Sequence, residues 1–254
     1  MSSATLQHTL NCQLAAPCPR LRVVAVVLAA GTASRMGGRP KCLLQRDGQT
    51  LLNRLLTALE TAGIDETVLV LGHKADTIQA SLSKRVHATL RRPHLPPMQI
   101  HQVLNPQPTD GQNSSLHLGL AKAQSLQAQW LMVALADQPL LEVVDLQALI
   151  AAVKNSPAGT HMLQPWVENQ PGNPVMLSQK VMTDLLTQAQ QDAVSGSTAS
   201  KDLPGGKEWR QRHPQQAHQW ATSNLHYRVD MDTLEDIQAL QTKYGVELTW
   251  DTPI

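Results

Sequence analysis

Short apolar runs alternate with amphipathic stretches along most of this chain. Near-continuous apolar runs at 23–28, 67–71 and 130–136 predict strands buried on both faces, and 99–105 predicts another strand. Apolar residues at helical spacing predict helices over 50–62, 75–82, 114–128 and 234–244. Gly63 is expected to end the first of these helices. The alternation predicts an α/β fold, with a doubly wound, mostly parallel sheet between two helical layers.

Composition adds limits to this picture. The net charge of +1 over 254 residues argues against broad binding to nucleic acid or to an anionic membrane. No apolar run has membrane-spanning length, and the first twenty residues lack a basic segment followed by an apolar core. Three cysteines without metal-ligand spacing favour a reducing, cytoplasmic location. We expect a flexible tail at 1–20 and one domain over 21–254.

The first predicted strand leads into a glycine-bearing, basic loop. Gly31 lets the backbone approach an anion, and Arg35 and Lys41 add positive charge, as a phosphate-binding turn requires. An ordinary strand-to-helix turn with solvated basic residues explains the same pattern. The segment contains neither a Walker-type phosphate loop nor a G-x-G-x-x-G fingerprint, which disfavours kinase-like and dinucleotide-binding interpretations.

Acidic and polar residues follow other predicted strands. Asp137 comes after the 130–136 run, at the edge where open α/β sheets bind ligands, although a turn or N-cap aspartate fits equally well. Asp232 or Thr233, with Glu235 and Asp236, is typical of a helix N-cap followed by first-turn acids. Ser114 or Ser115 is likewise a candidate N-cap. A Gly-, Ser- and Pro-containing stretch at 195–206 is expected to be a mobile loop.

The glycine-bearing loop resembles the L-A-A-G-x-x-x-R-M-G-x-x-x-K signature of the MobA-like nucleotidyltransferases, which have the nucleotide-diphospho-sugar transferase fold. The matching residues are Leu28, Ala29, Ala30, Gly31, Arg35, Met36, Gly37 and Lys41. Three residues separate Gly37 from Lys41, whereas these relatives more often have two. The resemblance implies that Leu28 to Gly31, Arg35 and Lys41 bind a nucleotide, and that Arg35 and Lys41 are catalytic.

The same resemblance extends to two acidic motifs. The segment 136–139 resembles the family's metal-binding A-D-Q-P arrangement. This resemblance implies that Asp137 is a catalytic Mg²⁺ ligand. The segment at 230–236 resembles D-x-D-T-P-E-D, which implies a second metal role for Asp232 and a weaker one for Asp230. Leu234 stands where many relatives have proline, and Glu235 and Asp236 are expected to be structural.

Two further segments resemble those with which the family recognises its reactants. Gly111, Ser114 and Ser115 belong to a G-x-x-S-S-L match, which implies contact with the nucleotide base. Gly172, Asn173 and Pro174 resemble the G-H-P-V acceptor segment of the molybdopterin-cytidylating branch. Asn173 replaces the common histidine, so this position is not expected to transfer a proton.

The resemblance predicts transfer of CMP from CTP to the phosphate of a molybdopterin-type cofactor, with release of pyrophosphate. Ala30 favours the cytidylyl branch because guanylyl-transferring relatives usually read L-A-G-G. Guanylyl and sugar-phosphate transfer are the next hypotheses. Recruitment as an NAD(P)-dependent oxidoreductase, or as a chaperone that delivers the cofactor to an apo-molybdoenzyme through 195–206, represents other classes.

Overall fold

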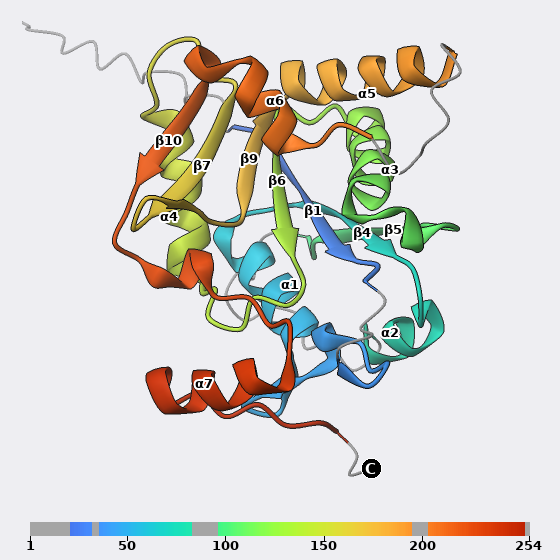
Figure 1. Ribbon diagram of the computed structural model, residues 1–254, viewed down its shortest axis with the longest axis vertical. Helices are drawn as coiled ribbons and strands as arrows, with labels where there is room; N and C mark the ends of the chain where they lie inside the picture. Colours follow the sequence, from blue (N-terminus) through green and yellow to red (C-terminus); the bar gives the residue numbers. More distant parts are fainter. Residues whose placement is uncertain (1–20, 32–35, 83–95, 195–202, 252–254) are drawn as a thin grey trace, which may run out of the picture.

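The computed structural model describes residues 21–31, 36–82, 96–194 and 203–251, and Figure 1 shows their arrangement. Its main sheet has the strand order β10-β7-β9-β6-β1-β4-β5, with β8 paired to β7. The strands β1 (Val23–Ala29), β4 (Glu66–Leu71), β5 (Gln99–Leu104) and β6 (Trp130–Leu135) are parallel neighbours. These four strands confirm the strands predicted at 23–28, 67–71, 99–105 and 130–136.

The other half of the sheet was not predicted. It contains β7 (Met162–Val167), β8 (Gln170–Pro171), β9 (Val175–Ser178) and β10 (Ala217–Ala221). β9 is antiparallel to both β6 and β7, whereas β10 runs parallel to β7. A separate hairpin pairs β2 (Gln45–Arg46) with β3 (Gln49–Thr50). The mostly parallel sheet agrees with the predicted fold class.

The predicted helices are present with small changes in their limits. They are α1 (Leu51–Ala62), α2 (Ala75–Leu82), α3 (Gln112–Ser125) and α7 (Leu234–Tyr244). Gly63 ends α1 with φ of 103°. α3 begins two residues before the prediction, with Gly111 as its N-cap, so neither Ser114 nor Ser115 is the cap. It ends early because Gln127 takes a positive φ of 56°.

Three helices and four short 3₁₀ turns complete the described structure. The helices are α4 (Val143–Lys154), α5 (Gln179–Val194) and α6 (Gly206–Arg212). The turns are η2 (Lys41–Leu43), η4 (Pro108–Asp110), η6 (Pro214–Gln216) and η7 (Leu225–Arg228). No helix in the described part of the chain combines the length and the apolar character needed to cross a membrane.

Strand β1 is buried on both faces, as its unbroken apolar run predicts. Ala25 and Val27 pack in one core with α1 and α4, whereas Val24 and Val26 pack in the other with α3 and α5. The sheet therefore lies between two helical layers, which confirms the three-layer α/β/α arrangement.

A third apolar cluster lies outside these two layers. It joins α7 and the following tail to residues near the strand ends, and its buried members are Met36, Leu44, Leu51, Leu140, Met231, Leu240 and Leu248. Figure 1 shows α7 set apart from the sheet. This cluster connects three segments that carry candidate site residues.

The predicted tail at 1–20 lies outside the described residues, as does 195–202 of the predicted mobile loop. The remaining part of that loop, 203–206, is packed against α3. Asn113 Nδ2 donates to the Leu203 carbonyl at 2.7 Å, and His117 Nε2 lies 2.7 Å from the Pro204 carbonyl. Pro204 and Gly205 are buried, and Gly206 begins α6.

Candidate active site

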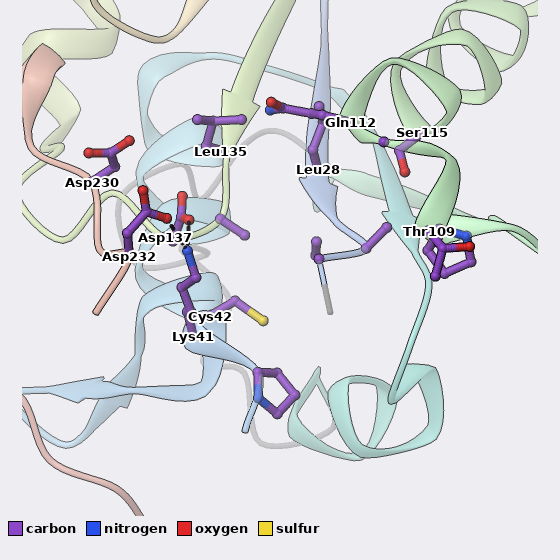
Figure 2. A pocket seen from close by; sticks show the side chains of 17 residues that line it. Leu28, Lys41, Cys42, Thr109, Gln112, Ser115, Leu135, Asp137, Asp230 and Asp232 are labelled. Carbon is purple, nitrogen blue, oxygen red and sulfur yellow. Dashed lines mark hydrogen bonds and ion pairs between the residues drawn. The ribbon is translucent and has the colours of Figure 1, made fainter. Parts of the chain in front are cut away.

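A cavity of about 570 Å³ opens where β1 and β6 end, as parallel-sheet topology predicts. Figure 2 shows that its two sides differ in chemistry. Lys41, Asp137, Asp230 and Asp232 gather on one side, which we call the charged end. Thr109, Gly111, Gln112 and Ser115 contribute to the other side, the neutral end. The cavity thus offers separate surfaces to charged and uncharged parts of one ligand.

Lys41 connects the acidic residues of the charged end. Its Nζ lies 2.5 Å from Asp232 Oδ1 and 3.4 Å from Asp137 Oδ2, although 191 and 96 positions separate these residues in the sequence. Asp137 follows β6, whereas Asp232 precedes α7. The structure therefore brings together the catalytic and metal-binding candidates Lys41, Asp137 and Asp232.

Burial and charge shape the ionisation of this group. Burial raises the pKa of Asp137, which Lys41 opposes and Asp230 reinforces. Burial and the nearby Asp232 charge also raise the pKa of Asp230. Partial burial alone lowers the pKa of the Lys41 ammonium, but hydrogen bonding to Asp232 and the two carboxylate charges raise it overall. Lys41 is therefore held as a cation against two aspartates.

Local structure fixes where these charges lie. Lys41 begins η2, whose next residue, Cys42, is buried, so the turn is anchored to the core. Burial raises the pKa of the Cys42 thiol to about 12, which makes it an unreactive packing group. The backbone position of Lys41 is thus supported by the burial of its neighbour Cys42 as well as by the hydrogen bonds of η2.

Asp232 is positioned by the start of α7. Asp236 Oδ2 accepts hydrogen bonds from the backbone N–H groups of Asp232 at 2.8 Å and Thr233 at 2.7 Å, while Thr233 Oγ1 accepts from Asp236 N at 3.3 Å. This capping box confirms the predicted N-cap and the structural role of Asp236. It leaves the Asp232 carboxylate directed to Lys41.

A buried amide organises the neutral end, and the sequence analysis missed it. Asn105 Nδ2 donates to both Ser114 Oγ and Ser115 Oγ at 2.9 Å, and Ser114 Oγ donates to the Gly111 carbonyl at 2.8 Å. Ser115 lines the cavity, whereas Ser114 stabilises the turn. The available signal was an asparagine directly after the 99–104 strand, where open sheets place ligand-binding residues.

The part of the cavity wall between the two ends is formed by Leu28, Ala29, Ala30 and Gly31. Their backbone is approached closely by Gly72, where an added Cβ would lie 2.7 Å from the Ala30 carbonyl oxygen. Any larger residue at position 72 would displace this wall. Arg35, the other basic residue predicted in the loop, lies outside the described residues.

A family model, the MobA-like NTP transferase domain, matches residues 25–204, which is more than half of the chain. The chain belongs to this family. The predicted resemblance is confirmed, and the matched range contains most of β1, Lys41, Asp137 and the neutral end of the cavity. Asp230 and Asp232 follow the matched range.

Two curated relatives show how widely the domain is used. This MobA-like chain is 34% identical over 130 residues to nicotine blue oxidoreductase of Paenarthrobacter nicotinovorans, covering 51% of this chain and 56% of that protein. It is 28% identical over 151 residues to the bifunctional protein GlmU of Synechococcus sp. (strain CC9311), covering 59% and 30% respectively. The chain thus matches about half and about a third of these relatives' lengths.

Solved structures share the fold over most of their length. Rv0371c from Mycobacterium tuberculosis H37Rv, in a complex with manganese, has a TM-score of 0.57 at 21% identity, covering 87% of this chain and 99% of that one. The nucleotidyl transferase Mth528 from Methanothermobacter has a TM-score of 0.63 at 19% identity, covering 87% and 96%. These likenesses establish the architecture of the MobA-like domain.

The predicted acceptor segment of this MobA-like domain does not line the cavity, although it contacts the residue after Asp137. Gln138 Nε2 donates to the Asn173 carbonyl at 3.2 Å, and Asn173 N donates to the Tyr227 carbonyl at 2.7 Å. A Cβ on Gly172 would lie 2.7 Å from that same carbonyl oxygen. The Asn173–Pro174 peptide is cis. An acceptor role for Gly172, Asn173 and Pro174 stays a prediction.

The charged end suits a divalent metal only together with a ligand. Across the part of the chain that the structure describes, no three His, Cys, Asp or Glu side chains are grouped closely enough to hold a metal ion. Asp137 Oδ1 is nevertheless buried without a hydrogen-bond partner. The Asp137 and Asp232 carboxylates both accept hydrogen bonds from Lys41. Two carboxylates completed by substrate phosphates are a typical Mg²⁺ environment.

Proposed function

We propose that this protein is a Mg²⁺-dependent nucleotidyltransferase that transfers CMP from CTP to the phosphate of a molybdopterin-type cofactor and releases pyrophosphate. The observation that carries the transferase proposal is the meeting of Lys41, Asp137 and Asp232 at one end of a cavity lined by the family's signature loop. Membership of the MobA-like NTP transferase domain family supports the same reaction class.

The reaction makes one P–O bond and breaks another. An acceptor phosphate oxygen attacks the α-phosphorus of CTP in line, and the bond from that phosphorus to the bridging oxygen breaks as pyrophosphate leaves. In this proposal the Gly31 loop and Arg35 hold the β- and γ-phosphates, and Lys41 stabilises negative charge on the transferring phosphoryl group.

Asp137 and Asp232 would hold the Mg²⁺, which when bound neutralises phosphate charge and orients the reactants. The complex of the structurally similar Rv0371c with manganese supports a divalent cation. The chain's own contribution is positional, because nucleotidyl transfer requires no covalent enzyme intermediate.

The base preference rests on the wall between the two ends. Ala30 lies in this wall. In this proposal its methyl group disfavours a purine, a difference worth about 1–3 kcal/mol of discrimination. Ser115 and Gln112 offer neutral hydrogen-bonding groups beside it. We therefore place cytosine at the neutral end, with guanylyl and sugar-phosphate transfer as alternatives within the same reaction class.

One observation favours a second candidate of another class. The likeness to nicotine blue oxidoreductase supports a recruited NAD(P)-dependent oxidoreductase. The charged end argues for transfer instead, since two carboxylates completed by substrate phosphates suit a divalent cation, which hydride transfer from a dinucleotide does not require. The chaperone hypothesis depends on 195–206, most of which lies outside the described residues.

Ligand titration and product analysis test the proposal. The purified full chain is titrated with CTP, GTP, ATP and NADPH in the presence of Mg²⁺, and CTP is expected to bind most tightly. Mass spectrometry after incubation with CTP and molybdopterin cofactor should detect the cytosine dinucleotide form and pyrophosphate. Tight GTP binding without CTP binding would reject the cytidylyl assignment, and NADPH binding without pyrophosphate release from any triphosphate would favour the oxidoreductase.

A further inference from the structure

Lys41 occupies the position that the proposed metal requires. One ammonium lies 2.5 Å from Asp232 Oδ1 and 3.4 Å from Asp137 Oδ2, as the dashed lines in Figure 2 show. A divalent cation cannot share these two oxygens with the ammonium, because two like charges at such distances repel strongly. A metal ion that arrives alone therefore competes with the ammonium for Asp137 Oδ2 and Asp232 Oδ1, whereas Asp137 Oδ1 has no hydrogen-bond partner.

The Lys41 side chain can leave this position without a change in the fold. Its backbone is held in η2 by hydrogen bonds from Leu43 N to Pro40 O at 2.9 Å and from Leu44 N to Lys41 O at 3.0 Å. Its charge sits at the end of a flexible four-carbon stem. The side chain is 20% exposed and lines the open cavity, so its ammonium has room to move.

The charge balance of the cavity gives a reason for such a movement. Among the described residues that line it, Asp137, Asp230 and Asp232 face the single cation Lys41. A nucleoside triphosphate entering alone would meet an excess of negative charge. A metal–nucleotide complex brings two positive charges to the carboxylates and offers its phosphate oxygens to the displaced ammonium.

We infer that Lys41 is an internal cation of the nucleotide-free protein, and that it exchanges places with the divalent metal when the metal–nucleotide complex binds. The ammonium moves from Asp232 and Asp137 to the phosphates as the metal takes the carboxylates. This inference rests on the proposed function. It requires that Lys41 oppose metal binding in the absence of nucleotide and assist nucleotide binding in the presence of metal.

Two binding measurements on the full chain test the exchange. Mn²⁺ affinity without nucleotide is measured by electron paramagnetic resonance of the free ion, and CTP affinity with Mg²⁺ by calorimetry. Lys41→Met should bind Mn²⁺ at least about tenfold more tightly than the wild type, because the competing charge is gone, and should bind CTP at least about tenfold more weakly. Lys154→Met, which changes an exposed residue of α4, is the matched control and should alter neither value.

The opposite directions of the two effects distinguish exchange from simple damage. A disturbed site would weaken both ligands, and a lysine that only binds phosphate would leave Mn²⁺ affinity unchanged; either result overturns the inference. Asp232→Asn in the Lys41→Met background should remove the gained affinity. Should Lys41→Met fail to fold by circular dichroism, Lys41→Gln must show the same gain. If Lys41→Met binds Mn²⁺ more tightly but the wild type binds no nucleoside triphosphate, the proposed function is rejected. That result would still show that Lys41 competes with the metal ion for the carboxylates.

Discussion

The Asp137 carboxylate combines a costly location with few stabilising contacts. Its side chain is 24% exposed, its Oδ1 has no hydrogen-bond partner, and its Oδ2 lies 3.4 Å from Lys41. A group placed this way contributes little to folding, since burial penalises its charge. Its position is explained by ligand binding, and active sites commonly contain such unfavourable groups.

Asp137→Asn should therefore separate activity from stability. Loss of one preorganised charge is expected to lower turnover of the best triphosphate by about 100- to 1000-fold, by analogy with the removal of single donors in other active sites. The circular dichroism spectrum and the melting temperature should stay close to those of the wild type. Asp76→Asn, which changes an exposed residue of α2, is the control with unchanged turnover. Activity retained in Asp137→Asn would remove the catalytic assignment.

His117 is a second buried polar residue, and its role is structural. Its Nε2 lies 2.7 Å from the Pro204 carbonyl, which can only accept, so this nitrogen carries the proton. Its Nδ1 is buried without a partner. Burial lowers the pKa of the imidazole below its usual 6.5, although the Pro204 carbonyl opposes this shift. A neutral His117 thus attaches the 203–205 segment to α3.

The lowered pKa predicts a pH dependence of stability. In the unfolded chain His117 takes up a proton as the pH falls through about 6.5, whereas the folded chain resists it until a lower pH. The free energy of unfolding should therefore decrease below about pH 6.5. His117→Gln, which keeps a donor for the Pro204 carbonyl, should reduce this decrease. Melting temperatures at pH 7.5 and 5.5 test it, and an identical pH dependence in both proteins would contradict it.

Helix α3 lies close to the sheet because Gly119 has no side chain. A Cβ on Gly119 would lie 2.5 Å from Val26 Cγ1 and 3.3 Å from Val70 Cγ2. Both valines are completely buried in the core shared with α3. Because α3 begins at Gln112 and carries Ser115, its distance from the sheet also sets the position of the neutral end of the cavity.

Gly119→Ala should accordingly destabilise the protein by about 1–3 kcal/mol through overpacking, despite the higher helix propensity of alanine. Val26→Ala removes the methyl groups that a Cβ at 119 would meet. The double variant should lose less stability than the sum of the two single variants. Urea unfolding of all four proteins measures this coupling, and additive or stabilising effects would show that the close contact is not limiting.

Across the whole molecule, the third apolar cluster links the segments that form the charged end. Met231 is fully buried between Asp230 and Asp232 in sequence, and it shares the cluster with Met36 of the signature loop and with Leu140. The tail after α7 closes the cluster with Leu248, and Thr249 pairs with Gln45 through backbone hydrogen bonds of 2.8 and 3.0 Å. The relative positions of Lys41, Asp137 and Asp232 thus depend on the end of the chain.

Deletion of 246–254 should weaken the site while the main sheet survives. The far-ultraviolet circular dichroism spectrum is expected to stay near that of the wild type, because the described part of this segment, 246–251, contributes to neither of the two main cores. Amide hydrogen exchange should accelerate at 36–46, and affinity for Mg²⁺–CTP should fall at least about tenfold. Unchanged exchange at 36–46 would show that the tail does not support the signature loop.

Local sequence patterns predict the strands of the first half of the chain but not those of the second half. Strands β1, β4 and β6 were predicted because parallel strands buried on both faces form continuous apolar runs. β7 was missed because Gln164 and Pro165 interrupt its pattern, and β9 because four residues give too little periodicity. The insertion of β9 between β6 and β7 depends on pairing between distant segments, which local patterns do not contain.

For the site, the sequence by itself determined the residue types and their positions at strand ends. Lys41, Asp137 and Asp232 were selected by the signature loop, by the end of a buried strand and by a family motif. Only the tertiary structure shows that the Lys41 ammonium contacts both carboxylates. These contacts span 96 and 191 positions of sequence, and the packing of the sheet and of the third cluster sets them. The same packing decided that Asn105 organises the neutral end and that the predicted acceptor segment lies outside the cavity wall.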